Sequence, residues 1–339
     1  MIRLGLCCKF HKEAIAFKTA TATALQRLPR RQQLAKLAQL AIANAEALQA
    51  ALNFCAAHGI GCFRVNSQIL PVKTHPTVGY ATGELPDAAG IVAAFTACGL
   101  FAKEHGLRLS FHPDQFILLS TPDPDILRKS LRDLEYQAEV AEWVHADVIN
   151  LHAGGGYGNK PEALERLAAV IGTLSPAVRS RLTLENDDRI YTPADLLPLC
   201  RAVRIPFVYD VHHHRCLPDG LSAEEATRQA LATWDREPLF HVSSPKEGPA
   251  CKNPRPHHAF ITPSDFPDAW HPLTLTVEVE AKAKEEAIAR LRQALARKRV
   301  RLWPGPPPRC RRPPSARLPD RFVCLPHHAE NAIMKKTFS

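Results

Sequence analysis

The sequence predicts a TIM (β/α)8 barrel, a single α/β domain, and three observations support this fold class. Short β-rich runs alternate with longer helical patterns, which is typical of parallel βαβ units. Eight such units fit within about 300 residues, the size of this barrel. An open doubly wound sheet would carry a Gly-rich phosphate turn after an early strand. The Gly-rich HAGGGYGN, residues 152–159, instead follows the fourth strand and begins with His, so no nucleotide cofactor is expected.

The first half of the chain supplies four strand–helix units. In the order strand then helix, they are 2–8 and 31–59, 60–66 and 87–106, 107–112 and 123–145, and 146–152 and 161–174. Gly59 and Gly106 end two of these helices, as glycine commonly does. Asp123 and Asp125 suit the start of the third helix, because carboxylates are favourable at a helix N-terminus.

The second half supplies the remaining four units, one of them incomplete. They are 181–187 and 193–203, 205–214 and 222–234, 237–245 with the irregular stretch 246–272, and 273–280 and 281–298. The barrel domain is therefore expected to span residues 1–299. Residues 300–339 are Pro/Arg-rich without any period, so this tail is predicted to be disordered. A dispensable extension is favoured over a DNA-grasping arm.

Composition indicates a globular protein, with 45% hydrophobic and 23% charged residues. No window approaches the ~20 uninterrupted apolar residues of a membrane span, and the N-terminus lacks a signal-peptide layout. We therefore expect a cytoplasmic protein that does not bind membranes. The ten cysteines contain no CxxC pair, which argues against a thiolate zinc site.

The formal charge of +9 is unevenly distributed. From Arg301 onward the chain carries eight Lys/Arg and two acidic residues, so residues 1–300 hold only +3. The charge is compatible with DNA binding but is weak evidence by itself.

Metal-ligand residue types follow most of the predicted strands. They are His112, His152, Glu185, Asp210 with His212, His213 and His214, His241, and Glu278 with Glu280. In a barrel these strand ends point into one mouth, where active sites of this fold lie. A lone His at a strand end is more often an ordinary turn residue. Six consecutive strands that end in this way instead indicate a centre for Zn2+, Mn2+ or Fe2+.

Charge supports the same interpretation, because so many carboxylates in one cavity would raise one another's pKa unless cations were bound. Asp210 and His213 are three residues apart, so a ligand role for both requires the chain to curl after the strand. His212 would then point away. Glu280 lies nearer the strand end than Glu278 and is the preferred ligand.

Six strand-end segments together resemble the UV damage endonuclease family. They are FHPDQF, INLHAGG, LTLENDD, YDVHHH, FHVSSP and VEVEAKAKE, in this order, and FRVNSQILP with His75 downstream resembles the family's second-strand segment. The resemblance covers about residues 2–298. It implies a barrel similar to that of endonuclease IV, and a monomer.

The resemblance implies hydrolysis of double-stranded DNA immediately 5′ to a UV photoproduct, leaving a 3′-hydroxyl and a 5′-phosphate. The cofactor would be two or three divalent ions. Mn2+ is the preferred metal, and Zn2+ and Mg2+ are the alternatives. Matching positions give the metal ligands His75, His112, His152, Glu185, Asp210, His213, His241, His257 and Glu280. Gln115 and Phe116 match the pair that probes the lesion, where an aromatic ring can fill the gap left by displaced bases.

The chain departs from the family pattern at three places. The family's modified lysine falls on Leu239, which removes a possible bridging carbamate and leaves the number of ions open. An expected Asp is Ala259, next to His257 and His258, of which His257 is the preferred ligand. The first strand continues as LCCKF, where some members carry Tyr and Asn.

Glu185, Glu280, His241 and Lys246 are the expected catalytic residues, with the two glutamates best placed to bridge ions. Lys246 is interpreted equally well as a phosphate contact or as a solvated loop lysine. Arg64 would either hold DNA phosphate or pair with a carboxylate. The alternative functions are cleavage at abasic sites, sugar isomerisation in the same kind of barrel, and, least favoured, DNA binding without catalysis.

Overall fold

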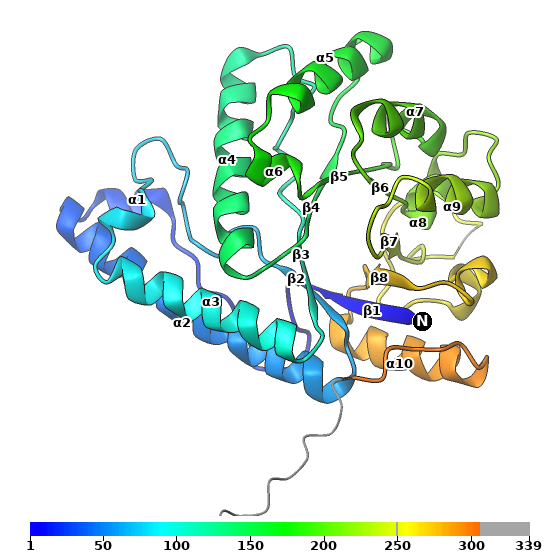
Figure 1. The fold of residues 1–339 in the computed structure, drawn as a ribbon, viewed down its shortest axis with the longest axis horizontal. Helices are drawn as coiled ribbons and strands as arrows, with labels where there is room; N and C mark the ends of the chain where they lie inside the picture. The colour runs from blue at the N-terminus through cyan, green and yellow to red at the C-terminus, as the bar shows by residue number, and fades with distance from the viewer. Residues whose placement is uncertain (249, 306–339) are drawn as a thin grey trace, which may run out of the picture. The chain divides into compact units, whose positions relative to one another are not determined.

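The computed structural model describes residues 1–248 and 250–305, and these residues form the predicted barrel (Figure 1). Eight parallel strands are hydrogen-bonded in the order β6-β5-β4-β3-β2-β1-β8-β7. The strands are β1 (Ile2–Cys7), β2 (Cys62–Val65), β3 (Arg108–Phe111), β4 (Val148–His152), β5 (Leu182–Glu185), β6 (Phe207–Val208), β7 (Leu239–Val242) and β8 (Leu275–Val279). The predicted disorder of the tail falls mostly on residues 306–339, outside the described residues.

The helices surround the strands, as Figure 1 shows. They are α1 (Ala22–Gln26), α2 (Arg30–His58), α3 (Ala88–Glu104), α4 (Pro124–Trp143), α5 (Lys160–Thr173), α6 (Pro176–Arg179), α7 (Pro193–Val203), α8 (Val211–Cys216), α9 (Ala223–Leu231) and α10 (Lys284–Arg297). The connection between β7 and β8 contains two 3-10 turns, Pro263–Asp265 and Asp268–Trp270. The sequence predicted this stretch to lack a regular helix.

The barrel closes between β6 and β7 through a single bridge. Asp210 pairs with His241, and the His241 N–H donates to the Tyr209 carbonyl at 3.0 Å. β6 is only two residues long because Asp210 already caps the N-terminus of α8. The curl that the sequence required after this strand is therefore the helix α8.

Helix ends follow the chemistry expected from the sequence. Gly59 ends α2 with φ +66°, in the left-handed region that glycine occupies at little cost. One oxygen of Asp123 accepts the N–H groups of Asp125 at 2.8 Å and Ile126 at 3.2 Å at the start of α4. These N–H groups have no partner inside the helix, so the carboxylate satisfies them.

Within the described chain, α2 is long and apolar enough by length and composition to cross a membrane. Its apolar side is nevertheless occupied: Leu37, Leu48 and Leu52 are fully buried in the hydrophobic core. The core helix of a globular protein passes the same length and composition test, so this finding is weak evidence for a membrane span.

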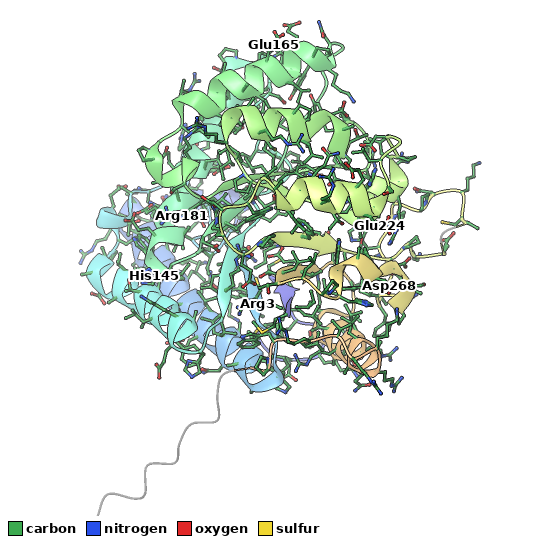
Figure 2. All side chains as sticks on the ribbon, turned by 45° about the vertical axis from the view of Figure 1, so that its right-hand side comes forward. Arg3, His145, Glu165, Arg181, Glu224 and Asp268 are labelled. Carbon is green, nitrogen blue, oxygen red and sulfur yellow. The ribbon has the colours of Figure 1, made fainter. Side chains whose placement is uncertain are left out.

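The amino end of the barrel is covered by a segment that follows α10. The Ile2 N–H donates to the Arg301 carbonyl, and the Trp303 N–H donates to the Ile2 carbonyl, each at 2.7 Å. The indole of Trp303 is almost buried, and the guanidinium of Arg3 (labelled in Figure 2) lies 5.4 Å from its ring centroid. The folded chain thus continues past residue 299, the predicted end of the barrel domain.

Candidate metal centre at the mouth of the barrel

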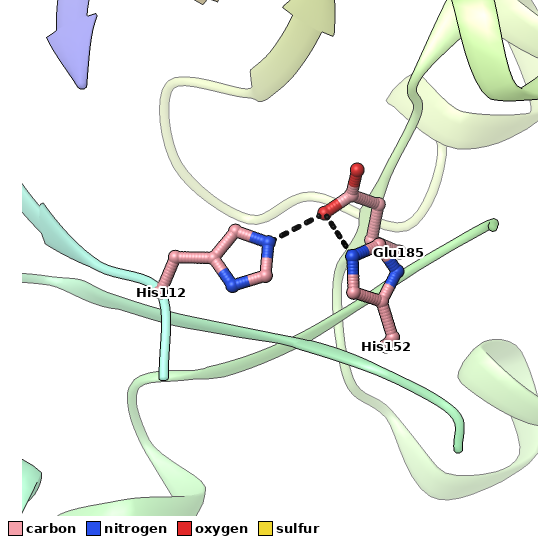
Figure 3. A group of neighbouring side chains, drawn as sticks. All are labelled: His112, His152 and Glu185. Atoms are coloured by element: carbon pink, nitrogen blue, oxygen red, sulfur yellow. Dashed lines mark hydrogen bonds and ion pairs between the residues drawn. The ribbon is translucent and has the colours of Figure 1, made fainter. Parts of the chain in front are cut away.

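Three adjacent strands bring the first ligand-type residues together (Figure 3). His152 and Glu185 are register partners at the ends of β4 and β5, and His112 directly follows β3. Nε2 of His112 lies 3.0 Å from Oε2 of Glu185, and Nε2 of His152 lies 3.8 Å from the same oxygen. The strand-end pattern therefore converges in space, as the barrel prediction required.

The carboxylate of Glu185 is the centre of the cluster and is fully buried. Besides His112 and His152, it contacts two further imidazoles through Oε1: Nδ1 of His241 at 2.9 Å and Nδ1 of His213 at 3.3 Å. One carboxylate thus lies among four histidines from four different segments. This position suits the bridging role that the sequence predicts for Glu185.

The short helix α8 places Asp210 and His213 on the same side of the mouth. Oδ1 of Asp210 accepts the N–H groups of His212 at 2.6 Å and His213 at 2.8 Å, which starts the helix. One turn later, Nδ1 of His213 lies 3.6 Å from Oδ2 of Asp210. His212 turns elsewhere, with Nε2 3.4 Å from the Arg255 carbonyl, as expected.

Glu280 follows β8 and contacts the cluster through His241 and His257. Its Oε1 lies 3.6 Å from Nδ1 of His241, and its Oε2 lies 3.7 Å from Nδ1 of His257. The neighbouring His258 instead accepts the Phe260 N–H on Nδ1 at 2.9 Å. Of the two candidate histidines, His257 is thus the one that faces Glu280.

Arg64 and Glu278 form a charged pair beneath these ligands. Nε of Arg64 donates to Oε2 of Glu278 at 2.6 Å, and its Nη1 lies 2.8 Å from Oε1 of Glu280. The same Glu278 oxygen lies 3.1 Å from Nε2 of His241, and Ser110 donates to the other oxygen. Of the two roles considered for Arg64, the structure shows the pairing with carboxylates.

The electrostatics explain how so much charge is held in the interior. Burial acts to raise the pKa of Glu185, but the surrounding imidazoles, His241 foremost, hold this pKa well below its ordinary value. Burial alone would lower the pKa of His241, but mainly the Glu185 carboxylate raises it to about 10. Burial opposes ionisation of Glu278 too, yet Arg64 lowers its pKa to about 2.

The donor set fits divalent cations. Three groups of side chains each place three candidate ligand atoms within 4.8 Å of one another: His112, His152 and Glu185; His112, His241 and Glu280; Glu185, Asp210 and His213. Two atoms in the cluster, Oδ2 of Asp210 and Nδ1 of His152, are buried and have no hydrogen-bond partner among the described residues. Buried polar atoms are costly without partners. Imidazole nitrogen with carboxylate oxygen suits Mn2+ or Zn2+.

Four other predicted site residues lie away from this cluster. Nδ1 of His75 accepts the N–H groups of Thr77 at 3.1 Å and Val78 at 3.3 Å, and His75 belongs to none of the three groups. With Phe116 it lines a cavity of about 310 Å³ beside the mouth. Gln115 is exposed, as is Phe116, at 71% of its surface. The side chain of Lys246, on the β7–β8 connection, is exposed too.

A layer of polar residues lies below the ligands, and of its members only Glu278 was identified from the sequence. Ser110, Asn150, Thr183 and Glu278 each precede a ligand-type residue by two positions, and all are buried. Asn150 donates to Oε2 of Glu185 at 2.6 Å and accepts from Thr183 at 2.9 Å. Because alternate residues of a strand share a face, this spacing could have identified the layer.

Leu239 breaks this polar layer on β7. It precedes His241 by two positions, is fully buried, and packs with Val148 and Val208 in a small apolar cluster. The position that carries a modified lysine in the resembled family thus lies among apolar side chains and offers no ligand atom.

Comparisons with known proteins agree with the fold. The structure resembles that of SacUVDE with a TM-score of 0.79 and 24% identity, over 89% of this chain and 100% of that one. It also resembles endonuclease IV from Thermus thermophilus, with a TM-score of 0.57 and 14% identity over 87% of this chain and 99% of that one. D-psicose 3-epimerase from Clostridium cellulolyticum H10 matches with a TM-score of 0.52 and 13% identity, over 88% and 98%.

Fold and site together define a TIM-barrel protein with a candidate His/carboxylate metal centre at the carboxyl ends of its strands. The profile of the family described as UV-endonuclease UvdE matches residues 2–302. The UV DNA damage endonuclease of Bacillus thuringiensis subsp. konkukian (strain 97-27) is 36% identical over 239 residues, 68% of this chain and 73% of that protein. That of Bacillus cereus (strain Q1) is 36% identical over 236 residues, with the same coverage. The chain belongs to the UV-endonuclease UvdE family.

Proposed function

We propose that this protein is a metal-dependent endonuclease that hydrolyses DNA immediately 5′ to a UV photoproduct, leaving a 3′-hydroxyl and a 5′-phosphate. Cyclobutane pyrimidine dimers and 6-4 photoproducts are the proposed lesions. The main support for this function is that five histidines and three carboxylates cluster around Glu185 at the mouth of the barrel. Membership of the UvdE family supports the choice of substrate.

The ions would be held by the strand-end residues described above; Glu185 belongs to two of the three groups and Glu280 to the remaining one. Bound divalent ions would supply the Lewis acidity that activates water and neutralises charge on the scissile phosphate. Mn2+ is the proposed metal, with Zn2+ and Mg2+ as alternatives. Glu278 and Arg64 fix His241 and Glu280 from below, so that the ligand atoms remain oriented.

Recognition of the lesion is proposed to depend on deformability rather than on base sequence. A photoproduct weakens stacking and pairing, so displacing it from the duplex costs less than displacing intact bases. The exposed ring of Phe116, with Gln115 beside it, could fill the resulting gap. Lys246, exposed on the neighbouring connection, is proposed to contact phosphate.

The test uses an end-labelled duplex with one thymine dimer and metal-stripped protein, with and without added Mn2+. We expect a Mn2+-dependent nick directly 5′ to the dimer, absent on undamaged duplex and lost in Glu185→Gln. The variant keeps the shape of the side chain but removes the charge that the four imidazoles surround. Metal content of both proteins is measured in parallel.

Absence of a nick on the dimer duplex, with metal bound, would contradict the proposal. Nicking of an abasic duplex under the same conditions would then indicate an endonuclease IV-like activity. Failure with both duplexes would direct attention to sugar substrates of related barrels.

We further propose a cytoplasmic monomer that associates with the nucleoid when bound to DNA. The eight cysteines within the described residues are all free, which is usual in a reducing compartment.

A further inference from the structure

Two of the three large hydrophobic side chains exposed in the described part of the chain lie on loops that begin at two of the clustered histidines, His112 and His152. Phe116, 71% exposed, follows β3, and Tyr157, 41% exposed, follows β4. The third, Leu100, lies on α3. Phe116 has a proposed role at the lesion, whereas Tyr157 belongs neither to the ligand groups nor to the residues proposed to contact the lesion.

The loops that carry Phe116 and Tyr157 pack against each other. Oγ of Ser120, four residues after Phe116, donates to the Ala153 carbonyl at 2.7 Å. A Cβ added at Gly154 would lie 2.8 Å from the same Oγ, so glycine is required for this approach. The two loops start at His112 and His152, so Tyr157 is connected to the metal-ligand cluster by a short, closely packed segment.

The structure holds Tyr157 at the surface by specific contacts. Its φ of +48° lies in the left-handed region, which bulky residues rarely adopt. A Cβ added at Gly155 would lie 3.0 Å from the phenol ring, and Tyr191 donates to the Gly155 carbonyl at 3.1 Å. The Arg166 guanidinium lies 5.8 Å from the ring centroid and donates through Nε to the Ser120 carbonyl at 3.1 Å.

This arrangement costs backbone strain and leaves much of the ring outside the core. Strained positions of this kind are concentrated at functional sites. An aromatic ring beside a cationic side chain, next to a site for cleaving DNA, has the chemistry of a platform on which a base or deoxyribose stacks.

We propose that Tyr157 is a second DNA-contacting aromatic residue, which stacks on a nucleotide next to the lesion while Phe116 fills the gap at the lesion. This inference rests on the proposed function, because its ligand is the damaged duplex. Arg166 supports the ring from the protein side and is a positioning residue.

The experiment measures single-turnover nicking of the thymine-dimer duplex by the full chain with Mn2+, as a function of protein concentration. Tyr157→Ala is expected to raise the half-saturating concentration roughly 5- to 150-fold, which corresponds to the loss of one stacked base. Tyr157→Phe, which keeps the ring, should stay within about twofold of wild type. Leu100→Ala, which removes an exposed side chain on α3, is the matched control and should not change it.

A second variant separates DNA contact from folding. Tyr157→Gly relieves the left-handed backbone, so its thermal unfolding temperature should equal or exceed that of wild type while DNA affinity falls as in Tyr157→Ala. Because stacking neutralises no phosphate, the slope of log affinity against log salt should be unchanged in both variants. Metal content, measured by atomic spectroscopy, should also be unchanged.

The outcomes distinguish the two proposals. A wild-type protein that neither binds nor nicks the dimer duplex would overturn the proposed function itself. The wild-type protein could nick the duplex while Tyr157→Ala and Tyr157→Gly have the same half-saturating concentration as Leu100→Ala. That result would overturn only the role of Tyr157. A loss of affinity that follows a loss of thermal stability or metal content would assign Tyr157 a structural role and also overturn the inference.

Discussion

Asp210 divides its two carboxylate oxygens between two tasks. Oδ1 accepts two backbone N–H groups and starts α8, while Oδ2 is buried in the cluster and has no hydrogen-bond partner in the part of the chain that the structure describes. Glu278 has a supporting role: it is buried below the ligands, and its two oxygens contact Arg64, His241 and Ser110. At the scale of single residues, a substitution can therefore change metal binding while it preserves folding, or change folding stability while it preserves the metal ligands.

Asp210→Asn should separate the cap from the metal ligand. The amide oxygen can still accept the two N–H groups, so the metal-free protein should lose less than about 1 kcal/mol of unfolding free energy. Wild type at Mn2+ concentrations about 100-fold above Kd should gain about 2.7 kcal/mol, and the variant much less. Calorimetry with and without Mn2+ measures both quantities. An equal Mn2+ gain in the two proteins would exclude Asp210 as a ligand.

Glu278→Gln should destabilise the metal-free protein by about 3 kcal/mol, because it leaves buried Arg64 without its main counter-charge. Glu225→Gln, which breaks an exposed pair with Arg228, serves as the control and should change stability little. The double variant Arg64→Met/Glu278→Gln should lose less than the sum of the single variants, since both remove one interaction. Additive losses in urea unfolding would show that the pair is not coupled.

At the scale of elements, the sequence predicted the strands and the longer helices because periodicity and capping are local signals. The strand-end rule likewise identified His112, His152 and Glu185, which converge (Figure 3). α8 was not predicted as a helix, because VHHHRC has no apolar period and its only signal is the cap at Asp210. The contact of Arg64 with Glu278 joins strands β2 and β8, which are not neighbours in the sheet, so no local pattern could reveal it.

Glu285, in the first turn of α10, anchors the segment after β1. Its carboxylate accepts the N–H groups of His11 at 2.8 Å, Lys12 at 2.7 Å and Glu13 at 3.2 Å. Burial acts to raise the pKa of Glu285, but these N–H groups lower it overall. The depressed pKa means that this stabilisation is present above the ordinary glutamate pKa of about 4.3 and is lost as pH falls through the lower folded value.

We therefore expect hydrogen exchange at residues 11–13 to accelerate, beyond its intrinsic pH dependence, as pH falls below about 4.3. Glu285→Gln should show the faster exchange already at neutral pH. Glu286→Gln provides the control, because among the described residues the Glu286 carboxylate pairs only with the side chains of His11 and Lys12. Equal protection in Glu285→Gln and Glu286→Gln at neutral pH would show that the carboxylate does not hold this segment.

At the scale of the barrel, the two ends of the strands are built for different purposes. The carboxyl ends present histidines and carboxylates, whereas the amino ends are closed by packing and by backbone hydrogen bonds to residues 301–303. In this fold, active-site residues usually lie at the carboxyl ends of the strands, whereas residues at the amino ends contribute to stability. The stability of the barrel should therefore be sensitive to the closing segment.

Trp303→Ala should lower the unfolding free energy by about 3 kcal/mol, since it removes a nearly buried indole and its stacking with Arg3. Leu100→Ala, at an exposed position, should change it by less than about 0.5 kcal/mol. Chemical denaturation measures both. Nicking of the dimer duplex at low temperature should remain, because Trp303 lies at the opposite end from the cluster. A change of less than about 1 kcal/mol in Trp303→Ala would show that the segment does not close the barrel.

The pairing of β1 with its neighbours also affects how the chain folds during synthesis. β1 lies near the start of the chain, yet its partners include β8, which begins only at Leu275, and then Leu302. Until these residues emerge from the ribosome, one side of β1 remains an open strand edge, and open edges can pair with other chains. Folding of the nascent chain thus cannot finish until almost all of the barrel has been translated, and expression should depend on chaperones that shield this edge.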